Sequence, residues 1–369
     1  MPPYFKVQYL SGGVYTTIPN GQNVTVNVGR QAQLDQYNAS TAQAVIRYPN
    51  GYTSPITALV PGVKMRIRLN YNGTDYDVFV GKLANALTTY GIPYVGSVGN
   101  ADYLNLTLEG QLADFGRVSG LNYAMAAGSL TTQFATATTQ SGYTITFNNT
   151  WASTVAVPNM PATTISSTWG DWINRVALTL NGRLLEDTAT GLFLISPFSG
   201  LNGPANLSDV ANDASFANYQ QLTFTSLADN YYTQVTVSPE SYAAQTVQTG
   251  SSPYRTYTVN TLNNSTGQAL DYANYLLNNY GSPNIRINSA RIFLNATTAP
   301  IPPVTLSIGS VYTVTFRGTT YNCVLEGYTY SGDVSETYVT MYFSPAEQNA
   351  YLILNDDVFG KLDSNRLGY

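Results

Sequence analysis

Apolar and polar side chains alternate along several short segments near the start of the chain. The clearest are residues 23–30, 64–71 and 102–110, where large apolar residues recur at about every second position. Alternation of this kind is typical of strands that bury one face of a sheet. The pair Asn72-Gly73 separates the second of these segments from another alternating run, and it favours a β-hairpin whose tight turn needs positive φ at both central residues. These residues predict an antiparallel barrel or sandwich.

Two segments instead have the spacing of amphipathic helices. The first runs from residue 168 to 181, with Thr168 as N-cap, Asp171 three residues later and Gly182 as terminator. The second runs from residue 267 to 280 and is followed by glycine and proline stop signals. We expect both helices to pack on sheets of their own chain rather than to form a groove for a partner.

One hairpin pattern occurs twice. Residues 62–83 and 309–330 share a glycine, an alternating strand, a Gly-Thr-x-Tyr turn and a second alternating strand; a further glycine follows in each, Gly81 and Gly327. Two hairpins of similar composition can look alike by accident, so the pattern indicates either a duplication or a coincidence. A duplication predicts two related β-domains in one chain.

Composition strengthens the β prediction and removes several functions. Charged residues make up 10% of the 369 residues, against a usual ~25%, while the chain contains 30 tyrosines. The net charge is −5 and lysine and arginine form no long run, which disfavours specific nucleic-acid binding. We expect no secretory signal at the amino terminus and no segment that spans a membrane.

The sequence contains few candidate catalytic residues. The chain has no histidine and a single cysteine, Cys323, which we expect to be a small buried core residue. The remaining candidates are three acidic pairs beside turn residues: Asp75 with Asp77, Glu186 with Asp187, and Asp356 with Asp357. Short acidic residues in such places commonly cap turns. We therefore expect no catalytic, metal or cofactor site.

The order of several small motifs resembles the minor tail proteins of long-tailed bacteriophages. The resemblance covers most of the chain, although residues 121–249 match only in the coarse order of helix and strands. The matching residues at the start are Gly29, Arg30, Leu34, Asp35, Asn50, Gly51, Pro55, Pro61, Gly62, Phe79 and Gly81. Those at the end are Phe359, Gly360, Leu362, Asp363, Leu367, Gly368 and Tyr369.

This resemblance implies a mainly β fold with a few helices, of the α+β class, containing two barrel-like domains of the tail-tube type and a middle α/β insertion. The expected division is an N-terminal β-domain at 1–120, a middle domain at 121–250, a second β-domain at 251–350 and a docking tail at 351–369. In the last of these, the apolar residues of 358–369 are spaced too irregularly for one helix or strand face. We expect this tail to lie across a neighbouring chain.

The resemblance also implies a structural role in the virion, after synthesis in the host cytoplasm. The implied protein is the hub of a tail tip or baseplate, a homotrimer that forms a pseudo-sixfold ring and contacts distal tail, tail tube, tape measure and fibre proteins. DNA would pass through its channel without specific binding. The alternatives are a hexameric distal tail ring, a receptor- or carbohydrate-binding module, and an enzyme that degrades cell walls.

The last alternative is directly testable. Since histidine is absent and the acidic pairs lie beside turns, we expect the purified protein to release no labelled muropeptides from peptidoglycan. The measurement is fluorescence released over time, with lysozyme as the positive control and buffer as the blank. Release above the blank would contradict a non-enzymatic role.

Overall fold

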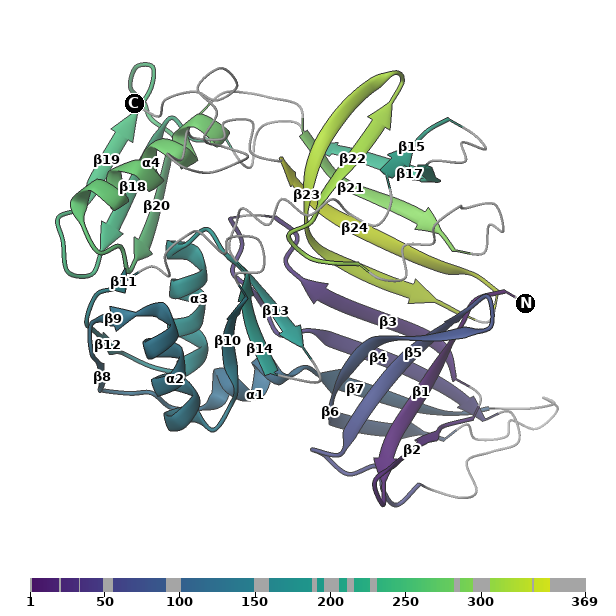
Figure 1. Cartoon of the computed structure of the whole chain (residues 1–369). Helices are drawn as coiled ribbons and strands as arrows, with labels where there is room; N and C mark the ends of the chain where they lie inside the picture. The colour runs from purple at the N-terminus through teal and green to yellow at the C-terminus, as the bar shows by residue number, and fades with distance from the viewer. Residues whose placement is uncertain are drawn as a thin grey trace.

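A computed structural model describes residues 2–19, 21–32, 34–48, 56–90, 101–148, 159–187, 191–195, 206–210, 216–225, 231–281, 286–294, 306–333 and 335–345. These residues are mainly strand with four α-helices, which confirms the predicted α+β class. Figure 1 shows one long sheet on one side and the helices on the other. The predicted docking tail, 351–369, lies outside the described residues.

Seven strands form what we call the first β-unit. They are β1 (Tyr4–Ser11), β2 (Val14–Thr17), β3 (Gly21–Gly29), β4 (Thr41–Tyr48), β5 (Lys64–Tyr71), β6 (Thr74–Thr89) and β7 (Asp102–Glu109). Their order in the sheet is β2-β1-β5-β6-β7-β4-β3, and all neighbours are antiparallel. The predicted hairpin is β5–β6, with φ of 50° at Asn72 and 83° at Gly73.

Seven further strands form the second β-unit. They are β15 (Asn206–Ser208), β16 (Phe216–Asn218), β17 (Gln221–Thr225), β21 (Arg286–Phe293), β22 (Val311–Phe316), β23 (Thr319–Gly332) and β24 (Thr337–Pro345). Their order is β16-β15-β22-β23-β24-β21-β17. The pairing thus places β15, β16 and β17, which fall inside the predicted middle domain, in the large sheet.

The two β-units have the same topology. In chain order, β15, β16, β17, β21, β22, β23 and β24 occupy the places of β1 to β7. Two pairings differ in direction, because β15 runs parallel to β22 and β16, whereas β1 runs antiparallel to β5 and β2. The hairpin β22–β23 turns at Arg317 and Gly318, with φ of 49° and 80°, like the turn of β5–β6. This agreement supports a duplication rather than a coincidence of composition.

Backbone hydrogen bonds support the same correspondence. Two bonds close each hairpin at equivalent positions: Gly62 N to Leu83 O and Leu83 N to Val63 O in the first unit, and Gly309 N to Leu325 O and Leu325 N to Ser310 O in the second. A β-bulge follows directly, after Leu83 in β6 and after Leu325 in β23. Beyond the bulge, Ala86 therefore corresponds to Tyr328.

The two β-units share one sheet because β23 pairs with β3. Each unit has one strand, β3 in the first and β23 in the second, whose edge is joined to the other unit and so is not available to close its own unit. The described strands contain no closed barrel. The two predicted barrel-like domains are thus open sheets within the mainly β, α+β fold. One hydrophobic core, with fully buried residues such as Ile67 and Val314, runs through both units.

A first insertion lies between the two β-units in sequence. It contains α1 (Gln111–Arg117), β8 (Tyr123–Met125), β9 (Gly128–Ser129), α2 (Leu130–Ser141), β10 (Ile145–Asn148), β11 (Asn159–Met160), β12 (Thr163–Ile165), α3 (Trp169–Thr179), β13 (Arg183–Asp187) and β14 (Gly191–Ile195). The predicted helix near 168–181 is α3, and Thr168 accepts the N–H of Asp171 at 3.2 Å as its N-cap. Its rings Trp169 and Trp172 pack edge to face in a separate core.

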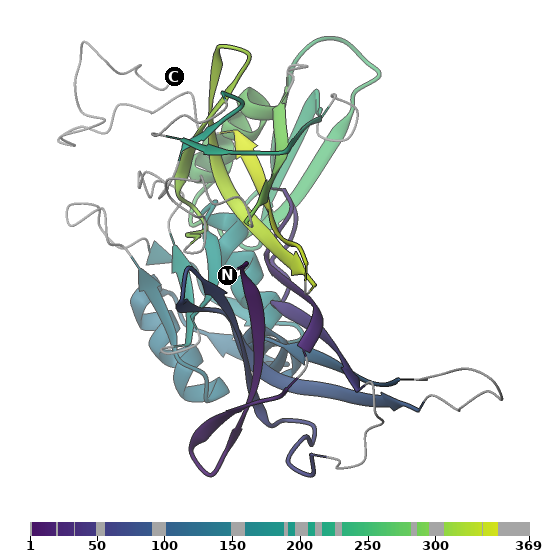
Figure 2. The same cartoon turned by 90° about the vertical axis from the view of Figure 1, so that its right-hand side faces the viewer.

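A second insertion separates β17 from β21. It contains β18 (Gln234–Pro239), β19 (Gln245–Gln248), β20 (Thr256–Thr261) and α4 (Thr266–Tyr280), the predicted helix near 267–280. Ala269, Ala273 and Leu276 of α4 pack against Val235 and Val237 of β18. Both predicted helices therefore pack within the chain. In Figures 1 and 2 both insertions lie on the same side of the large sheet.

Gly29 and Gly318 have the same φ of +80° but different surroundings, so substituting each one distinguishes the effect of backbone strain from that of steric crowding. A Cβ on Gly29 would lie 2.5 Å from the carbonyl oxygen of Glu326, whereas a Cβ on Gly318 would meet nothing within 4 Å. We expect Gly29→Ala to lower the free energy of unfolding by roughly 1 to 3 kcal/mol more than Gly318→Ala. Denaturant unfolding of both variants checks this, and equal losses would show that the β3–β23 contact tolerates separation.

Candidate functional site

Three charged side chains meet where the two β-units and the first insertion join. Glu326 lies at the bulge of β23, Arg30 directly follows β3, and Arg183 begins β13. Glu326 Oε2 accepts Arg30 Nε–H at 2.9 Å, and Glu326 Oε1 accepts Arg183 Nη2–H at 3.0 Å. The exposed fractions of Arg30, Arg183 and Glu326 are 5%, 2% and 0%. We call these three residues the Glu326 junction.

Local backbone geometry brings these groups together. The bulge between Leu325 and Gly327 changes the strand register at Glu326. A Cβ on Gly327 would lie 2.5 Å from the carbonyl oxygen of Arg30, so only glycine lets the two backbones approach this closely. The Arg30 guanidinium stacks 4.3 Å from the centre of the Tyr37 ring and donates to the Asp35 carbonyl at 3.1 Å.

Charge pairing compensates for burial at the junction. Burial alone raises the pKa of Glu326, but the nearby charges of Arg183 and Arg30 outweigh it and hold that pKa below its usual value. The carboxylate is therefore ionised at neutral pH. Because both its oxygens are occupied by arginines, the junction fixes the geometry of the chain rather than offering an acid or a base.

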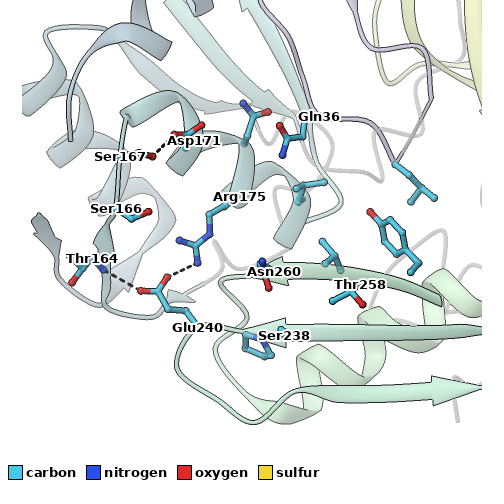
Figure 3. A pocket seen from close by; sticks show the side chains of 16 residues that line it. Gln36, Thr164, Ser166, Ser167, Asp171, Arg175, Ser238, Glu240, Thr258 and Asn260 are labelled. Atoms are coloured by element: carbon cyan, nitrogen blue, oxygen red, sulfur yellow. Dashed lines mark hydrogen bonds and ion pairs between the residues drawn. The ribbon is translucent and has the colours of Figure 1, made fainter. Parts of the chain in front are cut away.

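A polar cleft lies between the two insertions. Its volume is about 810 Å³, and its walls come from the segment after β3, from α3, and from β18 and β20. Figure 3 shows Arg175 reaching from α3 towards Glu240, with Asn260 across the cleft. Glu240 also accepts the Thr163 hydroxyl at 2.7 Å and the Thr164 N–H at 3.3 Å.

The carboxylates of the cleft are already engaged. Burial raises the pKa of Glu240, but the Thr163 hydroxyl and Arg175 lower it by more. The pKa of Glu240 therefore lies below its usual value. The hydroxyl of Ser167 likewise lowers the pKa of Asp171. Neither group is poised to exchange protons near neutral pH. The cleft is suited to hydrogen bonding with a polar ligand.

The chain is similar to known proteins in its structure and not in its sequence. No family model and no curated protein matches the sequence. The 43 kDa tail protein of prophage MuSo2 from Shewanella oneidensis superposes with a TM-score of 0.65 at 12% identity, covering 92% of this chain and 98% of that one. A tail protein from Neisseria meningitidis MC58 also gives 0.65 at 12% identity, covering 93% and 96%. The chain has the fold of phage tail proteins.

A third structure extends this tail-protein fold to a secretion machine. The E. coli c3393 protein, a type VI secretion system component described as structurally similar to T4 bacteriophage tail proteins gp27 and gp5, superposes with a TM-score of 0.57 at 9% identity. The match covers 94% of this chain and 77% of that one. These identities are low, so the likeness concerns the fold.

The first predicted acidic pair forms surface ion pairs in this tail-protein fold. Asp75 lies 2.8 Å from the Lys6 ammonium and 3.6 Å from Arg68, and Asp77 lies 2.5 Å from Arg68. The hydrogen bond from Lys6 is the main reason that the pKa of Asp75 is lowered. The two carboxylates lie beside a turn, as the sequence predicted, and both already have cationic partners.

In the second acidic pair, Glu186 accepts hydrogen bonds from the backbone and Asp187 lies at the end of a strand. Glu186 accepts the backbone N–H of Ser40 at 2.6 Å and that of Leu112 in the first turn of α1. Burial raises the pKa of Glu186, and these donors offset part of the rise. Glu186 is thus a cap supplied by another strand, while Asp187 ends β13. The third pair, Asp356 and Asp357, lies outside the described residues.

Other candidate chemistry is accounted for by burial. Cys323 is buried in β23, as predicted, and burial raises the pKa of its thiol to about 12. Across the part of the chain that the structure describes, no cluster of three or more Cys, Asp and Glu residues is arranged to hold a metal ion. None of the helices in that part has the length and hydropathy needed to cross a membrane.

The Glu326 junction was not predicted from sequence. Two of its three residues, Arg30 and Glu326, are 296 positions apart, and no spacing rule links them. A signal did exist, because Arg30 belongs to the motif that resembles tail proteins, and Glu326 directly precedes the closing glycine of the repeated hairpin. The polar cleft had no comparable signal.

The junction predicts a large difference between two carboxylate substitutions. Glu326→Gln leaves two buried guanidinium groups without a countercharge, so we expect the free energy of unfolding to fall by about 3 to 5 kcal/mol. Asp77→Asn breaks an exposed pair and is expected to cost less than about 1 kcal/mol. Urea unfolding at pH 7 measures both.

Acid provides an independent readout of the same prediction. Because the folded-state pKa of Glu326 is depressed, its stabilisation is present above the unfolded value of about 4.3 and is lost as the pH falls below it. The stability gap between the natural chain and Glu326→Gln should therefore narrow below that pH. A gap that is small at pH 7, or that widens in acid, would contradict this account of the junction.

Proposed function

We propose that this chain is a structural component of a bacteriophage tail tip or baseplate, namely the hub that closes or continues the tail tube. In this role it takes part in host attachment and DNA delivery. The observation that carries the proposal is the pair of β-units of equal topology joined edge to edge through β3 and β23. The likeness to the Shewanella and Neisseria tail proteins supports it.

The duplication favours three copies of the chain around one axis. Each chain contributes two similar units in tandem, so three chains supply six similar units, the number that a sixfold tube requires. Contacts between different edges of successive copies close into a ring when the rotation between units is uniform. The proposed partners are the distal tail, tail tube, tape measure and fibre proteins, and the proposed location is the virion.

The polar cleft favours a second candidate function, recognition of a receptor or carbohydrate. Its walls offer Gln36 and Asn260 amides and the half-buried Tyr257 ring, the kinds of group that hydrogen-bond and stack on sugars. The proposed ring of chains and the cleft are compatible, because the cleft is lined by the two insertions and the segment after β3, and not by strands of the large sheet.

A mass measurement tests the proposed hub. We expect native mass spectrometry of the purified full chain to give a homotrimer, and we expect three copies per tail in purified particles. Six copies in one ring would favour the distal tail ring instead. A chain that stays monomeric both alone and within the particle would contradict assembly through the β-units.

A further inference from the structure

Among the described residues, two open strand edges of the duplicated β-units correspond to edges that are paired elsewhere in the chain. Beyond Lys82, β6 pairs only with β7, whereas the corresponding part of β23 pairs with both β24 and β3. In the same way β17 pairs only with β21, whereas its counterpart β3 pairs with both β4 and β23. The two open edges are therefore the counterparts of the two edges that meet inside the chain.

We infer that the open edge of β6 pairs, antiparallel, with the open edge of β17 in a second copy of this chain. This inference rests on the proposed ring and specifies the contact that closes it. The intrachain pairing of β23 with β3 is the template, because it joins the same two kinds of edge between the same two kinds of unit.

The template also fixes the register of the contact. The bulges align β6 with β23, so that Leu87 corresponds to Thr329. The partners of β4 and β21 align β3 with β17, so that Asn27 corresponds to Thr225. Thr329 pairs with Asn27 inside the chain. Leu87 is therefore expected opposite Thr225 of the neighbouring copy, with Thr89 opposite its Thr223.

Apolar side chains that are exposed in the single chain support the pairing of the β6 edge with another strand. Leu87, near the end of β6, and Tyr90, directly after the strand, are 59% and 61% exposed. Long apolar edges invite uncontrolled pairing with other chains, and proteins avoid this by covering or charging them. The part of β6 that follows Lys82 contains no charged residue. A neighbouring strand removes this hazard.

Burial on β17 gives the same indication. Leu222 and Phe224 are only half-buried, while their counterparts in β3, Val24 and Val26, are 2% and 0% exposed beneath the paired β23. Phe224 already packs on Phe316 of its own unit. Adding β6 of another copy at this edge would complete a core that the chain on its own leaves partly open.

Disulfide trapping tests the register. The variant with Leu87→Cys and Thr225→Cys places a cysteine on each open edge, and the native Cys323 is buried and does not interfere. Opposed residues of antiparallel strands have Cα separations of about 4.5 to 5.5 Å, within the range of disulfides. Under mild oxidation by copper phenanthroline, we expect a covalent trimer on a non-reducing gel.

The register control moves one cysteine by two residues on the same face. Diagonal positions lie about 7 to 8 Å apart, so Leu87→Cys with Thr223→Cys should cross-link roughly tenfold less. Mixing the Leu87→Cys and Thr225→Cys single variants should give a covalent dimer, because the bond joins two chains. In the sheet, β21, β24, β23, β3, β4 and β7 lie between β17 and β6, which excludes a bond within one chain.

The outcomes separate this inference from the hub itself. A homotrimer by native mass that yields no disulfide, or yields equal amounts in both registers, overturns the edge pairing and leaves the ring in place. A protein that is monomeric both alone and within the particle, and that does not cross-link, overturns both. Trapping confined to the Leu87–Thr225 pair supports the inference.

Discussion

A single buried carboxylate between two guanidinium groups holds three parts of the chain in fixed relation. Glu326 belongs to the second β-unit, Arg30 leaves the first, and Arg183 enters the last hairpin of the first insertion. Charges removed from water must stay paired, because an isolated one costs several kcal/mol. The three parts therefore cannot separate independently, and the long sheet keeps one shape across the join between its units.

That fixed shape gives the duplication its functional meaning. If the two β-units moved freely, their open edges would face in no defined direction, and copies of the chain would associate in many ways. With the join fixed, the step from the first unit to the second is set by the pairing of β3 with β23. In the proposed ring, the same step applied between chains would be a uniform rotation. The glycines at this join, Gly29 and Gly327, permit the close backbone contact on which the step depends.

Local signals predicted the elements better than the arrangement. Asn72-Gly73 and Thr168 with Asp171 act through adjacent backbone, so the hairpin and the helix start could be predicted from sequence. The fusion of two units into one open sheet depends on the pairing of β23 with β3, which no local pattern encodes. The strands β15 and β16 span three residues each, too short for alternation to show. The polar cleft is formed by segments distant in sequence, including Gln36 and Glu240, and each is unremarkable alone.

The unequal lengths of the insertions have a consequence for symmetry. Between β3 and β4 the chain has the short segment 30–40, whereas between β17 and β21 it has residues 226–285, including a helix and a small sheet. In the proposed ring, the inner surface would repeat six times, while the outer surface would carry two different insertions at alternating positions, the first insertion beside the first unit and the second insertion beside the second unit (Figure 1). Such a ring presents sixfold geometry to one neighbour and threefold geometry to another, and so works as an adaptor between the two symmetries.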